Sequence, residues 1–158
     1  MDFLIRAAAR LMGGRPALWA RYDHAMEARR RADYGEAIAI FRSLAEQGHL
    51  NSQFQLGAMR RQGLGTPENP EEAALLYRHA AERGHGRAQG ALGALYVEGA
   101  GVPKDRLQAY VWQALSARNK DGWEDAELAV AGLRKVMTAE ELGEAERLIA
   151  DFRPKTGA

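Results

Sequence analysis

The chain has 158 residues, of which 46% are hydrophobic and 27% are charged, and its formal net charge is +1. This size and composition predict a soluble folded domain with a continuous buried core. The absence of cysteine excludes a disulfide framework and a thiolate metal site. A net charge near zero gives no global attraction for nucleic acid, and no apolar run has the length of a membrane-spanning helix.

The first 15 residues carry a short amphipathic pattern. Apolar side chains fall at helical spacing opposite Arg6 and Arg10, and these apolar residues are Phe3, Leu4, Ala7, Ala8 and Leu11. Two interpretations are open for this extension, 1–15. The helix packs on the first repeat, or residues 1–12 form a membrane-surface or targeting helix.

Charge is distributed unevenly along the chain. Residues 1–31 contain seven arginines and three acids, a net charge of +4, whereas residues 120–151 contain four bases and nine acids, a net charge of −5. Solvated faces usually account for such runs. A charge polarity of this kind also favours head-to-tail contacts or an oriented partner.

A leading helix is predicted over 17–31, because Pro16 is well placed at its start. Its predicted buried stripe is Trp19, Tyr22 and Met26. It would pair with a helix over 34–47, and the two would form an incomplete leading unit, 16–47.

The next part of the chain repeats itself. Residues 36–69 and 72–105 align at a constant offset of 36, with 14 identities among 34 positions. The identical pairs include Ala37/Ala73, Gly48/Gly84, His49/His85, Gly57/Gly93 and Pro67/Pro103. A period of this length predicts a stacked array of helical units. Arrays present binding surfaces more often than catalytic sites.

Each repeat is predicted to be an antiparallel helix pair, over 34–69 and 70–105. First helices are expected at 34–47, 70–83 and 106–118, because each start has capping-box spacing: Asp33 with Glu36, Asn69 with Glu72, and Asp105 with Gln108. Gly48 and Gly84 would end the first two of these helices. Second helices are expected at 50–62 and 86–98, followed by turns rich in glycine and proline.

Gly57 and Gly93 occupy the same place inside the second helices. Glycine inside a helix costs about 1 kcal/mol relative to alanine. Its presence twice at one repeat position predicts a close approach of neighbouring helices.

The end of the chain departs from the repeat. Placing Gly122 opposite Gly84 requires an offset of 38, so two residues are inserted. A helix is expected over 123–136, and a capping box at Thr138 and Glu141 opens a final helix to Phe152. These elements form a divergent terminal unit, 106–153, followed by a disordered tail, 154–158. Trp123 is interpreted as a cap contact or as an exposed binding anchor.

The segment AAERGHGRAQGALGALYVEGAGVPKD closely resembles the Sel1-like repeat family, which is related to tetratricopeptide repeats. The pattern consists of an alanine pair, Gly-His, Ala-Gln, Leu-Gly, Tyr, Gly-x-Gly-Val and Pro-x-Asp. The resemblance implies an all-α, right-handed solenoid over 16–153, with a concave face and an adaptor or scaffold role, as in bacterial members. The partner is not identified by it.

By the geometry of that family, the concave face is lined by the helices over 50–62 and 86–98. The candidate protein-binding residues on it are Asn51, Gln55, Ala58, Gln62, Arg87, Ala91, Ala94 and Glu98. Arg60 replaces the tyrosine of the family pattern, and either a partner or an ion pair with the neighbouring helix accounts for it.

No constellation predicts catalysis, a cofactor or a metal site. His49 and His85 are interpreted as turn residues about one repeat apart rather than together, and the glycine loops lack the lysine of a phosphate-binding loop. We therefore expect a non-enzymatic module that binds a protein or peptide and not nucleic acid, located in the cytoplasm. The alternative is a peripheral membrane regulator anchored by its first helix.

Overall fold

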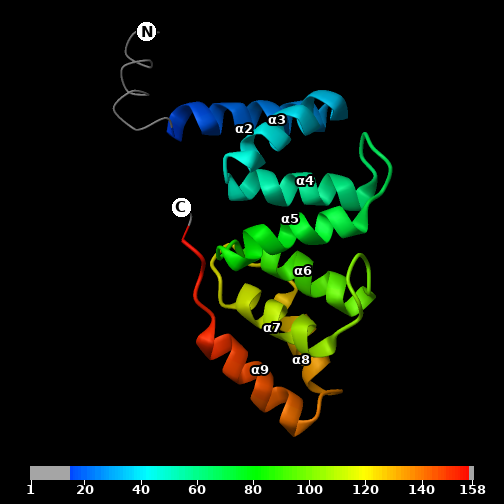
Figure 1. Ribbon diagram of the computed structural model, residues 1–158, viewed down its shortest axis with the longest axis vertical. Helices are drawn as coiled ribbons and strands as arrows, with labels where there is room; N and C mark the ends of the chain where they lie inside the picture. Colours follow the sequence, from blue (N-terminus) through cyan, green and yellow to red (C-terminus); the bar gives the residue numbers. More distant parts are fainter. Residues whose placement is uncertain (1–14, 157–158) are drawn as a thin grey trace.

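The computed structural model describes residues 15–156, which form eight α-helices and no strand. In chain order they are α2 (Arg15–Arg30), α3 (Tyr34–Glu46), α4 (Leu50–Gln62), α5 (Pro70–Glu82), α6 (Gly86–Glu98), α7 (Arg106–Ala117), α8 (Ala126–Arg134) and α9 (Ala139–Asp151). They stack in one column from α2 and α3 to α8 and α9 (Figure 1). The predicted all-α solenoid of helix pairs is confirmed.

The amphipathic pattern at residues 1–12 lies outside the described residues, and so does the membrane-anchor alternative that depends on it. Within residues 15–156, no helix has both the length and the apolar character needed to cross a bilayer.

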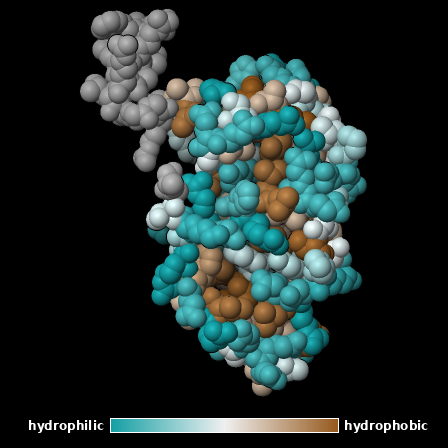
Figure 2. All heavy atoms as spheres, viewed as in Figure 1, coloured by the Kyte–Doolittle hydropathy of each residue, from teal (hydrophilic) through white to brown (hydrophobic). Residues whose placement is uncertain are grey.

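Three clusters of buried apolar side chains follow one another along the stack. The first lies among α2, α3 and α4, the second involves α4, α5 and α6, and the third lies among α7, α8 and α9. On the face shown in Figure 2, hydrophobic atoms reach the surface near α4 and α5 and again near α7 to α9. Each helix pair therefore completes its core against the next pair, as a repeat array requires.

The predicted helix starts are confirmed by their caps. The side chains of Asp33, Asn69 and Asp105 each accept a hydrogen bond from the backbone N–H three residues later, at 2.9 to 3.2 Å. The reciprocal bond of a full capping box joins Thr138 and Glu141 at the start of α9. At the three earlier starts the predicted reciprocal bond does not form.

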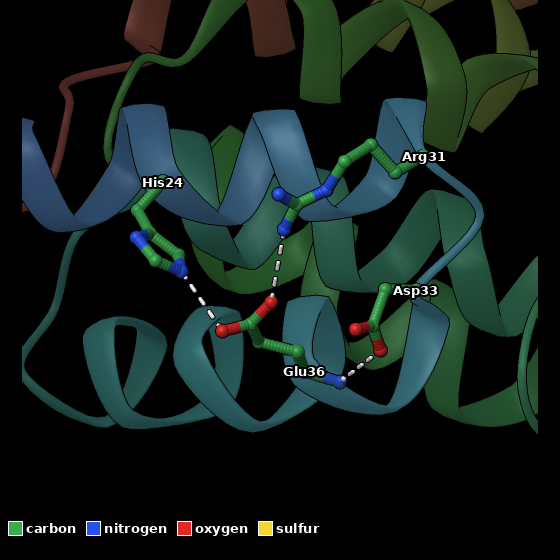
Figure 3. Close-up of polar contacts among 4 residues, drawn as sticks. All are labelled: His24, Arg31, Asp33 and Glu36. Atoms are coloured by element: carbon green, nitrogen blue, oxygen red, sulfur yellow. Dashed lines mark hydrogen bonds and ion pairs between the residues drawn. The ribbon is translucent and has the colours of Figure 1, made fainter.

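Glu36 illustrates why the box stays incomplete at α3 (Figure 3). Its Oε1 atom lies 2.8 Å from Nε2 of His24, and its Oε2 atom accepts a hydrogen bond of 3.3 Å from Arg31. Both partners belong to α2 or its end, so Glu36 joins α2 to α3 instead of returning to the cap backbone.

The buried stripe of α2 differs from the prediction. Trp19 is 46% exposed, and Tyr22 and Met26 are only half-buried, whereas Ala25 and Ala28 are fully buried. The two alanines let α2 approach α3 closely, which leaves the larger side chains at the margin of the contact.

The end of the chain also differs from the prediction. Helix α8 begins at Ala126 rather than at Trp123, and the backbone N–H of Trp123 instead donates a hydrogen bond of 2.9 Å to Oγ of Ser116. The tail after α9 turns back along the stack, and the N–H of Lys155 donates to the carbonyl oxygen of Glu82 at 2.8 Å. The tail 154–158, which was predicted to be disordered, is therefore held against the stack as far as Lys155.

The predicted close approach at the internal glycines is confirmed. A Cβ atom added at Gly57 would lie 2.7 Å from Cε1 of Tyr77, and one added at Gly93 would lie 2.9 Å from Cγ of Gln113. Both distances are shorter than carbon–carbon contacts allow, so glycine lets these helices pack directly on the neighbouring side chain.

A buried polar ladder, which was not predicted from the sequence, joins the second helix of each pair to the end of the first. The side-chain amides of Gln53 and Gln89 donate to the carbonyl oxygens of Ala45 and Ala81, each at 3.2 Å. Asn119 adds a bond of 3.0 Å to Oε1 of Gln89. The recurrence of glutamine 36 residues apart in the Ala-Gln motif was the signal that could have predicted it.

Candidate protein-binding surface

Two hollows open next to each other where α4 and α6 begin. The first has a volume of about 510 Å³ and is lined by Leu18, Trp19, Gln47, Gly48, His49, Leu50, Asn51 and His85. The second has a volume of about 280 Å³ and is lined by Phe54, Arg87, Gly122, Trp123, Glu124 and Asp125. The rings of His85 and Phe54 stack between them, with centroids 5.4 Å apart. We call the two hollows together the aromatic groove.

His85 forms the rigid floor between the two hollows. Its Nδ1 atom accepts the N–H of Ala88 at 3.1 Å, so this residue caps α6. Its Nε2 atom must then carry the proton and donate to Oδ1 of Asn51 at 2.7 Å. Burial lowers the pKa of His85, which agrees with a neutral ring. The predicted turn role is therefore confirmed.

His49 occupies the equivalent turn before α4. Its Nδ1 atom lies 2.8 Å from Oγ of Ser52, and its ring meets the edge of Trp19 with centroids 5.1 Å apart. Burial lowers the pKa of His49 as well. His49 and His85 stand at equivalent turns of successive repeats, and both line the first hollow.

Three of the eight predicted binding residues are buried in the fold, so they are not part of the candidate binding surface. Gln55 is 6% exposed and accepts a hydrogen bond of 3.0 Å from Arg29, while Ala58 and Ala91 are 9% and 0% exposed. Packing against α2 and the neighbouring helix pairs covers this part of α4 and α6.

The other five predicted residues are at least partly accessible. Asn51 and Arg87 line the groove. Glu98 is held by Arg61, whose Nη2 atom lies 2.6 Å from a carboxylate oxygen, and Ala94 and Gln62 lie on the same helices outside the two hollows.

Arg60 is explained within the fold. Its Nε atom lies 3.0 Å from Oε2 of Glu72, and only 11% of its side chain is exposed. The ion pair with the neighbouring helix therefore accounts for the departure from tyrosine, and Arg60 is not part of the groove.

Sequence reasoning missed Trp19 and Phe54 as surface residues and named only Trp123 among the aromatic ones. Trp19 and Trp123 are 46% and 39% exposed and stand at opposite ends of the groove, and Phe54 lies between them. Trp123 makes the predicted cap contact, because its backbone bonds to Ser116 of α7 and its side chain packs on Gly90 of α6, and its ring is still partly exposed. Within residues 15–156, no group of three or more histidine, aspartate or glutamate side chains could hold a metal ion.

Stacked helix pairs with an open groove define a helical-repeat protein built to present a surface. The chain belongs to the Sel1 repeat family, because the Sel1 repeat model matches residues 25–49, 50–85 and 86–121, more than half of its length. Proteins of this family are generally protein-interaction modules and are typically non-catalytic. None of the curated proteins matches this sequence.

Two solved structures resemble this one. The first is c5321, a protective antigen present in uropathogenic Escherichia coli strains that displays an SLR fold. Its sequence is 30% identical to this one and the TM-score is 0.80, over an alignment that covers 85% of this chain and 29% of that chain. The second is a Sel1 repeat protein from Oxalobacter formigenes, 26% identical with a TM-score of 0.60, over 79% of this chain and 50% of that chain. This chain thus spans half or less of either bacterial relative.

Proposed function

We propose that this protein is a non-enzymatic interaction module that binds an extended segment of another protein along the aromatic groove. The observation that carries the proposal is the exposure of Trp19 and Trp123 at its two ends. Tryptophan is enriched among the residues that dominate binding energy, because it offers a large contact area and loses little conformational freedom.

The rigidity of the groove supports the proposal. The hydrogen bond from His85 to Asn51 and the stack of His85 on Phe54 hold its floor before any partner arrives. A preformed floor lowers the cost of ordering on binding, so more of the contact energy contributes to affinity.

The test uses a phage-displayed library of random peptides selected on the full-length protein. We expect selected peptides to lose about tenfold or more in affinity for Trp123→Ala, as for a central aromatic anchor. Leu128→Ala serves as the matched control, because Leu128 is 74% exposed and lies outside the groove. Peptides that bind Trp123→Ala and Trp19→Ala as tightly as the unmodified protein would refute the assignment of the groove.

A further inference from the structure

The two hollows of the aromatic groove differ in charge. The first is lined by no carboxylate, whereas the second is lined by Glu124 and Asp125, which directly follow Trp123 in the chain. Asp121 lies close by, since its Oδ1 atom is 2.7 Å from where a Cβ atom of Gly86 would stand. The only cation among the side chains that line the second hollow is Arg87.

In the part of the chain that the structure describes, the fold pairs none of these carboxylates with a cationic side chain. Among residues 15–156, the ion pairs found within 4.0 Å include none of Asp121, Glu124 and Asp125. Asp125 stands at the start of α8 without making a side-chain capping bond, although capping is the usual role of aspartate there. Glu124 and Asp125 are both exposed, so their charges are available to a partner.

Aromatic faces accompany the carboxylates in the same hollow. Trp123 is 39% exposed, and Phe54 is partly exposed beside it. An aromatic face next to a carboxylate suits a lysine or arginine side chain, because the apolar stem packs on the ring and the cationic head meets the anion.

We infer that the second hollow selects a basic side chain of the bound segment, and that the first hollow takes an apolar side chain against Trp19. This inference rests on the proposed function. The stem of the lysine or arginine lies on Trp123 and Phe54, and its head lies at Glu124 and Asp125. Arg87, which lines the same hollow, repels a second cation, so the groove favours one basic residue over a polybasic segment.

The test compares the peptides selected on the full-length protein with those selected on Glu124→Lys/Asp125→Lys. We expect the unmodified protein to enrich peptides with one lysine or arginine next to apolar residues. The affinity of these peptides for Glu124→Lys/Asp125→Lys should be about tenfold or more lower than for the unmodified protein. Their affinity for the unmodified protein should weaken as the salt concentration rises, because the contact between the basic side chain and the carboxylates is partly exposed. The variant should lose this enrichment in its own selection.

Glu140→Lys/Glu146→Lys is the matched control, since it makes the same charge change at exposed positions of α9 outside the groove. Its affinity for the selected peptides should stay within about twofold, because exposed charges outside the groove are screened by salt. Peptides that depend on Trp123 but contain no basic residue would overturn this inference and leave the proposed function standing. Peptides that depend on neither tryptophan would overturn both.

Discussion

Gly57 faces Tyr77 across the contact between α4 and α5, and replacing it with alanine tests how closely the repeats pack. The added Cβ atom would lie 2.7 Å from Cε1 and 2.9 Å from Cδ1 of the ring. Tyr77 is only 3% exposed and packs on Phe54 at 5.6 Å between centroids, so the ring has little room to move. The new methyl group therefore overpacks the interface.

Two opposing effects set the magnitude. Overpacking typically costs about 1 to 3 kcal/mol, while alanine inside a helix is favoured over glycine by about 1 kcal/mol. Gly57→Ala should therefore lower the free energy of unfolding by about 0 to 2 kcal/mol. Gly143→Ala on α9 is the control, because nothing lies within 4 Å of its added Cβ atom. That variant should be stabilised by about 0.5 to 1 kcal/mol.

Urea unfolding followed by circular dichroism measures both variants. The helix propensity gain is common to the two, so their difference of about 1 to 3 kcal/mol reports the overpacking. If Gly57→Ala raises the free energy of unfolding as much as Gly143→Ala does, the close packing of Gly57 on Tyr77 is refuted.

Three further outcomes are expected. Gln89→Leu should lower the free energy of unfolding, measured by urea denaturation, by about 1 to 3 kcal/mol. Gln53→Leu should lower it less, because Oε1 of Gln53 has no hydrogen-bond partner. Equal losses in the two variants would contradict the proposed role of the ladder. Burial lowers the pKa of His85 from 6.5, so the unfolded chain binds the proton more tightly and stability should fall as the pH drops below about 6.5. Melting temperatures at several pH values check this, and His85→Asn, which keeps a capping side chain, should reduce the fall. Thr138→Ala should cost about 0.5 to 2 kcal/mol by removing the α9 cap, whereas Thr138→Ser should restore most of the loss.

The positions of the helices followed from local chemistry. Asp33, Asn69 and Asp105 mark helix starts because a short polar side chain satisfies a backbone N–H three residues away. Gly48 and Gly84 mark helix ends because the backbone there has φ of 78° and 87°, which glycine adopts without strain. Such signals act within one turn of the chain, so a single sequence is enough to locate them.

The surface was harder to predict than the helices. Gln55, Ala58 and Ala91 share a helical stripe with exposed residues, yet the neighbouring helices bury them. Conversely, Trp19 belongs to an apolar pattern that predicts burial, and the fold leaves it 46% exposed. Periodicity identifies one face of a helix, but how much of that face is covered depends on how far the next helix overlaps it.

The sequence by itself determined the array: the offset of 36, the internal glycines and the capped helix starts follow from local backbone preference repeated along the chain. Only the tertiary structure decided where a partner could bind. It brings Trp19, His85 and Trp123 along one groove, although they are distant in the sequence. The physical reason is that the groove forms from contacts between successive repeats, and no spacing within one repeat records them.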